Sequence, residues 1–191
     1  MMMRSKTQGD TIIEVMLAFA IFAAAAVGTI AVLNNGVATT QRNLETTLVR
    51  QQIDSQAEML RYIHNTKNPL WQSLKATTAL VTSPQPLANS CTTIANMSKA
   101  FYIQPAINTA NPTATTFVRK AISSATYVAP SVYAVIDYSE ATPQTQGIWI
   151  QATKAQQNGP IAAYDFYIHA CWDGVGTNQK MTLGTIVRIY D

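Results

Sequence analysis

Glu14 is the one ionisable side chain in an apolar segment that runs from Thr11 to Leu33. A carboxylate deep in a lipid bilayer costs about 2–3 kcal/mol, and less near the interface. A buried charge is tolerated where it meets an opposite charge. The chemistry to expect of Glu14 is therefore ion pairing with a cation, rather than catalysis.

The other reactive side chains are scattered and form no catalytic set. His64 and His169 are isolated, and we expect each to pack or to lie on the surface. Cys91 and Cys171 belong to no CxxC motif or Cys/His cluster, so a zinc site is not expected. The Gly-x-Gly within "DGVGTNQK" (173–180) precedes no helix and is typical of a hairpin turn rather than a phosphate loop. The sequence thus predicts no catalytic residues, no metal and no cofactor, in a protein that is not an enzyme.

A helix must position Glu14 within the apolar segment. Residues 11–33 are about 34 Å long as an α-helix, which is enough to cross the hydrocarbon core of a bilayer. Arg4 and Lys6 precede the segment, and no acid lies before Asp10. The positive-inside rule predicts that the start of the chain stays in the cytoplasm and that everything after Leu33 is exported.

Three interpretations of this segment compete. One is a cleaved secretory signal peptide, because residues 1–9 are basic and "AFAIFAAAAVG" offers small residues for cleavage. Glu14 and the amphipathic helix that follows argue against it. Another is an ordinary single-pass anchor, which fits the length but leaves Glu14 unexplained. A lipoprotein anchor is excluded, because this region has no cysteine.

The third interpretation rests on a resemblance. The stretch "GDTIIEVMLAFAIF" resembles the N-terminal signature of type IV prepilins and type II secretion pseudopilins. That family has a short basic leader ending in Gly, followed by a helix that opens with a pattern like F-T-L-I-E. Gly9 matches the leader glycine, and Thr11 to Glu14 match the positions after the first mature residue. Asp10 departs from the pattern, because the family usually has Phe there, and this tilts the interpretation toward a minor subunit.

The resemblance implies how the chain would be processed and where it would act. A prepilin peptidase that is also an N-methyltransferase would cleave after Gly9 and methylate the new terminus at Asp10. The chain would start as a single-pass precursor in the cytoplasmic (inner) membrane, with its N-terminus inside. It would then join other pilin subunits in an extracellular pilus or at the cell surface. Glu14 would pair with the terminal amine, of a neighbouring subunit or of its own, and so direct assembly.

The helical pattern continues beyond the apolar segment. After "NNG" (34–36), a candidate flexible joint, apolar residues recur with spacings mostly of three and four, which is typical of an amphipathic helix. These residues are Leu44, Leu48, Val49, Ile53, Ala57, Leu60 and Ile63. Charged residues that include Arg42 and Glu45 supply the expected solvated face. We expect one helix from about Asp10 to Asn65, apolar all round in its first half and on one side in its second.

Strand patterns dominate the last third of the chain. Four β-branched and aromatic segments are separated by turn-like stretches, and consecutive strands with short loops favour an antiparallel sheet. The predicted strands are 131–139, 147–153, 162–172 and 181–191. The fold class expected is therefore α+β, and the resemblance implies that it is pilin-like, with a long N-terminal helix packed against a C-terminal antiparallel sheet of about four strands. In sequence order, the predicted parts are a leader (1–9), an apolar helix half (10–33), an amphipathic helix half (34–66), a loop-rich connection (67–130) and the sheet (131–191).

Cys91 and Cys171 are candidates for one disulfide. If the C-terminal part is exported, a bond between them closes a loop of about 80 residues and contributes about 4 kcal/mol. In a reducing compartment both would stay free thiols. The wide spacing departs from the many pilins whose cysteines bracket a C-terminal loop, so the receptor-binding loop of that family is not carried over.

Composition limits the partners. The charged fraction is 12%, and the net charge is +3 with scattered Lys and Arg, so a nucleic-acid partner is not expected. An uncharged polar surface favours a cell-surface protein. The sequence predicts a structural subunit of a type IV pilus or related filament, a minor pilin or pilin-like protein. The alternative is a single-pass membrane-anchored surface protein whose exported β domain binds a ligand.

Overall fold

The structure, a computed structural model, describes residues 12–85, 91–107, 115–139, 143–155, 161–175 and 179–191. The chain divides into two compact units, residues 1–41 and 42–191. The helices are α1 (Ile12–Asn65), α2 (Leu70–Leu74) and the 3-10 helix η1 (Cys91–Asn96). The strands are β1 (Phe101–Ile107), β2 (Thr115–Ala121), β3 (Tyr127–Val128), β4 (Val135–Asp137), β5 (Gln144–Gln146), β6 (Ile148–Ala155), β7 (Ala163–Asp173) and β8 (Lys180–Tyr190).

The first half of α1 forms a helix because Ala, the best helix former, is its most frequent residue and it has no proline. Thr29 in this half, and Thr39 and Thr40 just beyond it, donate their hydroxyls to the carbonyl four residues earlier, so they need no partner outside the helix. The helix is continuous through residues 34–36, the candidate joint.

The second half of α1 buries one face in the 42–191 unit. The buried residues follow spacings of three and four, as the amphipathic pattern predicts, and they are Glu45, Val49, Ile53, Gln56, Ala57, Leu60 and Ile63. The expected pattern is wrong at its start, because Leu44 is 59% exposed and Glu45 is buried. Glu45 occupies the core-facing position because the Trp172 indole donates a hydrogen bond to its carboxylate at 3.1 Å.

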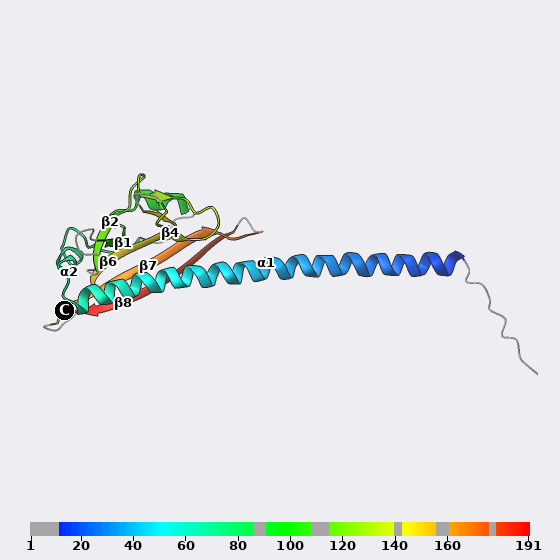
Figure 1. The fold of residues 1–191 in the computed structure, drawn as a ribbon, viewed down its shortest axis with the longest axis horizontal. Coiled ribbons are helices and arrows are strands. Elements are labelled where there is room, and N and C mark those ends of the chain that lie inside the picture. The colour runs from blue at the N-terminus through cyan, green and yellow to red at the C-terminus, as the bar shows by residue number, and fades with distance from the viewer. Residues whose placement is uncertain (1–11, 86–90, 108–114, 140–142, 156–160, 176–178) are drawn as a thin grey trace, which may run out of the picture. The chain divides into compact units, whose positions relative to one another are not determined.

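The main sheet has five strands in the order β2-β1-β6-β7-β8, and each neighbouring pair is antiparallel (Figure 1). The longest register joins β7 to β8, from Ala163↔Tyr190 to Asp173↔Lys180. The prediction of an α+β chain with a long N-terminal apolar helix packed against a C-terminal antiparallel sheet is confirmed. Strands β6, β7 and β8 correspond to the last three predicted strands.

The predicted strand at 131–139 is wrong in extent and position. Only Val135–Asp137 is a strand, and it belongs to a second sheet with order β3-β5-β4. The chain passes from this sheet into the main one at Gly147, where φ is +79° and an added Cβ would lie 2.2 Å from the carbonyl oxygen of Cys171. That glycine separates β5 from β6, and the main sheet takes β1 and β2 from the 67–130 region instead.

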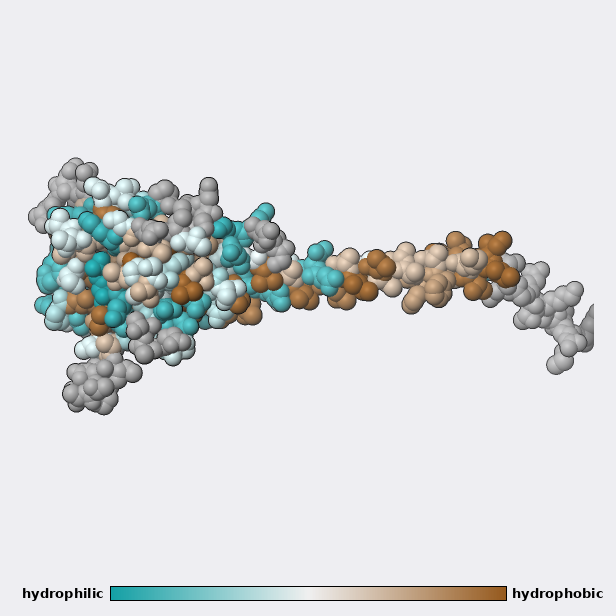
Figure 2. All heavy atoms as spheres, turned by 90° about the horizontal axis from the view of Figure 1, so that it is seen from above, coloured by the Kyte–Doolittle hydropathy of each residue, from teal (hydrophilic) through white to brown (hydrophobic). Residues whose placement is uncertain are grey.

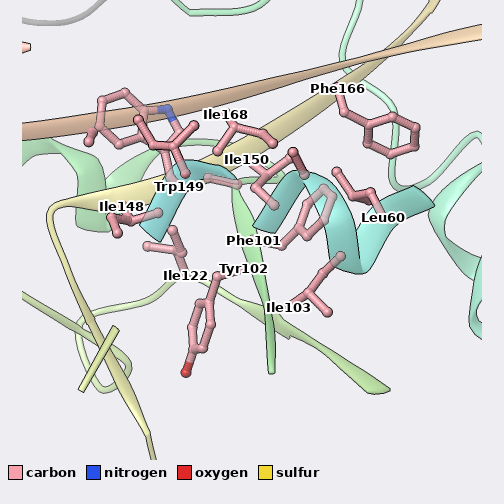
Figure 3. Close-up of a cluster of buried hydrophobic side chains, with 14 of the residues drawn as sticks. Leu60, Phe101, Tyr102, Ile103, Ile122, Ile148, Trp149, Ile150, Phe166 and Ile168 are labelled. Atoms are coloured by element: carbon pink, nitrogen blue, oxygen red, sulfur yellow. The ribbon is translucent and has the colours of Figure 1, made fainter. Parts of the chain in front are cut away.

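The core lies between the second half of α1 and the main sheet. Figure 3 shows Leu60 of α1 among Phe166, Ile150 and Phe101 of the sheet. Tyr102 points the other way, as strand alternation requires, and its hydroxyl donates to the carbonyl of Pro143 just before β5. The second sheet therefore lies against the face of the main sheet opposite α1.

Candidate functional site

Glu14 lies in the first turn of α1 and is exposed. Exposed apolar side chains follow it along this half of the helix, as the face drawn in Figure 2 shows. Twelve large apolar side chains between Ile12 and Leu33 are each more than half exposed, from Val15 at 57% to Ile12 at 79%. Full burial of one such side chain is worth about 1.5–3 kcal/mol, so this surface requires lipid or protein to cover it.

The length and composition of α1 meet the requirement for a membrane span, and one helix of the described residues does so. A long apolar N-terminal helix that is able to anchor the chain is therefore present. The candidate processing residues, Gly9 and Asp10, lie outside the described residues.

The helix dipole alone does not account for Glu14. A carboxylate in the first turn gains about 0.3–1 kcal/mol from the positive end of the helix. A charge at depth in a bilayer costs about 2.5–3.5 kcal/mol. The gain is smaller than the cost at depth, so a cation near Glu14 would stabilise the acid in an apolar layer.

Small side chains give part of α1 a smooth surface. Residues 23–26 are alanines, and Gly28 follows after Val27, with no atom within 4 Å of the position that a Cβ would take. Small residues allow helices to approach closely in apolar surroundings. This part of the helix is thus suited to contact with other helices.

The disulfide expected if the chain is exported is present in the structure. Cys91 at the start of η1 is bonded to Cys171 in β7, with a Cα–Cα distance of 5.6 Å. Both residues are buried, at 3% and 0% exposure. The Tyr127 hydroxyl donates to the carbonyl oxygen of Cys91, and burial raises the pKa of Tyr127. The bond ties the segment before β1 to strand β7 of the main sheet.

The two histidines occupy aromatic environments. His64 meets the ring of Trp71 edge-on, with centroids 4.9 Å apart. His169 lies between Trp149 and Tyr167, at centroid distances of 5.3 and 6.3 Å, and burial lowers its pKa. Among the described residues, no three His, Cys, Asp or Glu side chains gather in a way that would hold a metal ion.

Two polar residues that anchor the helix to the sheet were missed by sequence reasoning. The Glu45 carboxylate accepts a hydrogen bond from the Trp172 indole. Gln56 donates one hydrogen bond to the backbone of Ile103 and accepts another from it, at 2.9 Å each. Both lie at core-facing positions of the helical repeat, at spacings of four and three from Val49 and Ile53. A polar residue at such a position is the signal that could have identified them.

No protein-family model, curated protein or solved structure matches this chain.

Proposed function

We propose that this chain is a pilin-like structural subunit, of the minor kind, in a type IV pilus or a related filament. The observation that carries the proposal is the combination within α1. Its first half is apolar and exposed on all sides with one acid in the first turn, and its second half packs against an antiparallel sheet. A chain built this way is suited first to lipid and then to a bundle of like helices.

The proposed precursor spans the inner membrane with Arg4 and Lys6 on the cytoplasmic side. A membrane peptidase hydrolyses the peptide bond after Gly9, and Asp10 then carries a new ammonium group at the head of the helix. The same enzyme methylates that nitrogen. The new cation lies within reach of carboxylates on the first turns of such helices.

Glu14 then makes docking favourable. In lipid its carboxylate lacks a fixed partner, whereas in a bundle it pairs with the terminal ammonium of a neighbouring subunit. The exposed apolar surface of residues 12–33 is covered by other helices at the same time, and the small residues Ala23 to Ala26 and Gly28 allow close approach. A wrong axial register would leave the acid unpaired, so the pair selects the register.

The disulfide supports export of the 42–191 unit. Disulfides persist in oxidising compartments outside the cytoplasm. The Cys91–Cys171 bond therefore agrees with the direction that Arg4 and Lys6 predict.

N-terminal analysis of the chain expressed in membranes, with and without a prepilin peptidase, tests the proposal. Intact-mass measurement should show loss of residues 1–9 and a start at Asp10 only when the peptidase is present. Gly9→Ala is expected to block the cut. A full-length product, or a cut near Ala26, would contradict the proposal, and the alternative of an anchored surface protein with a ligand-binding β domain would then be favoured.

A further inference from the structure

A polar hollow lies where α1 ends and α2 begins. Its volume is about 580 Å³, within the range of about 300–1,000 Å³ that is usual for small-molecule sites. The polar groups around it come from His64, Asn65, Lys67, Asn68, Gln72 and Asp191. It belongs wholly to the 42–191 unit, so it is separate from the apolar half of α1.

The backbone around the hollow is fixed by hydrogen bonds. Lys67 adopts a left-handed conformation with φ of 53°, and its amide donates to the carbonyl of His64 at 3.0 Å. The Asn68 amide donates to the carbonyl of Ile63 at 3.0 Å, which completes a Schellman closure of α1. The Asn68 side chain accepts from the amide of Leu70 at 3.0 Å and so starts α2. The hollow is therefore preformed rather than shaped by a ligand.

One wall is a carboxylate held by two donors. The Trp71 indole donates to Oδ1 of Asp191 at 3.0 Å, and the Lys75 ammonium donates to Oδ2. The hydrogen bonds from Lys75 and then Trp71 lower the pKa of Asp191, so the group stays ionised at neutral pH. Trp71 itself is 4% exposed and is covered on one side by His64. This wall is rigid, and the two carboxylate oxygens of Asp191 can still accept hydrogen bonds from a ligand.

Two other side chains that line the hollow have no hydrogen-bond or ion-pair partner among the described residues. The side chains of Lys67 and Gln72 are exposed, and neither makes a side-chain hydrogen bond or ion pair with any residue that the structure describes. The side-chain Nδ2 of Asn68 likewise donates to none of the described residues. Donors and acceptors thus face the hollow in addition to the carboxylate of Asp191.

The charges and the polarity decide the class of ligand. Asp191 and Lys75 form an ion pair and offset each other's charge, which favours a neutral ligand over an ion, and Lys67 disfavours a cation. An apolar ligand would leave the amides of Asn68 and Gln72 without partners, which is unfavourable. A neutral molecule with several hydroxyl groups satisfies donors and acceptors together, while Pro69 offers apolar contact. We propose that this hollow binds a neutral saccharide.

The proposal goes beyond filament assembly and does not depend on it. A chain that is anchored but never polymerises would carry the same hollow. Failure of the saccharide test therefore leaves the proposal for α1 untouched, and failure of processing at Gly9 leaves the saccharide proposal untouched.

The test uses the full chain in a detergent without a sugar head group, with ¹⁵N-labelled tryptophan. The chain has three tryptophans, so three indole N–H signals are expected, and the spectrum of Trp71→Phe assigns the one at the hollow. Glucose, galactose, mannose and N-acetylglucosamine are each titrated into the millimolar range. Inorganic phosphate and ethanolammonium serve as the anionic and cationic probes.

A saturable shift of the Trp71 signal with at least one sugar, and with neither ion, is the expected result. Gln72→Ala should then weaken binding about 2- to 10-fold, the loss expected for one hydrogen bond. Gln51→Ala, an exposed glutamine of α1 outside the hollow, should bind as the unmodified chain does. Saturation by phosphate or ethanolammonium instead of a sugar overturns the proposal, and so does the absence of a response to all four sugars.

Discussion

Gln56 of α1 takes the place of a strand beside Ile103 of β1. Its amide nitrogen donates to the Ile103 carbonyl, and its amide oxygen accepts from the Ile103 N–H, at 2.9 Å in both cases. Strand β1 pairs with β6 only at Phe101↔Ile150, so Ile103 has no strand partner on that side. Gln56 is 1% exposed, and the pair locks the helix to the sheet at the point where the two strands diverge.

Gln56→Leu should destabilise the 42–191 unit by about 2–4 kcal/mol, because two buried backbone groups each lose a partner at about 1–3 kcal/mol. Urea denaturation of the full chain in detergent, followed by near-UV circular dichroism, measures the loss. Gln51→Leu is the matched control at an exposed position of the same helix. Equal midpoints for the two variants would show that the pair contributes no net stability.

Loss of the Cys91–Cys171 disulfide should lower the free energy of unfolding, while the chain still folds. In the chain-entropy model, a bond that closes a loop of 80 residues contributes about 4 kcal/mol. The Cys91→Ser, Cys171→Ser double variant is expected to lose about 2–5 kcal/mol. A denaturation midpoint that is the same for the oxidised chain and the double variant would contradict this expectation.

The environment of His169 predicts a loss of stability in mild acid. Burial between Trp149 and Tyr167 lowers the pKa of His169 in the folded state below its ordinary value of 6.5. The unfolded chain therefore binds a proton first as pH falls below about 6.5, and stability decreases until the folded-state pKa is passed. His169→Phe keeps an aromatic ring in the stack and should flatten this decrease. Thermal melts across the range from neutral to mildly acidic pH measure it, and an unchanged slope in His169→Phe would assign the effect to another group.

Periodicity in the sequence predicted the elements whose burial is one-sided. The spacing of Val49, Ile53, Leu60 and Ile63 identified the packed face of α1, and the β-branched and aromatic runs identified β6, β7 and β8. The same reasoning failed where a polar side chain is buried. Glu45 was assigned to the solvated face because its charge outweighed its position in the repeat, and its partner Trp172 is distant in sequence.

Long-range pairing explains the other differences. Strands β1 and β2 pair along seven residues, yet Pro105 and the amide of Gln104 weaken the strand pattern of β1. The expected strand at 131–139 is shortened to Val135–Asp137, which pairs only with the three residues of β5 in the second sheet. The hollow beside Trp71 is lined by residues from the end of α1 and by Asp191, which are far apart in the sequence. No local sequence pattern predicts that they come together.

Glu14→Leu tests the central claim most directly, with Asp54→Asn as the control at an exposed acid of the packed half of α1. The measurement is the amount of this chain in filaments sheared from cells, relative to the amount in membranes. Removal of the acid should reduce the sheared fraction about tenfold or more, the effect of at least 1.4 kcal/mol, while membrane insertion and cleavage after Gly9 persist. Filaments that contain as much Glu14→Leu chain as unmodified chain would contradict the proposed role of the acid.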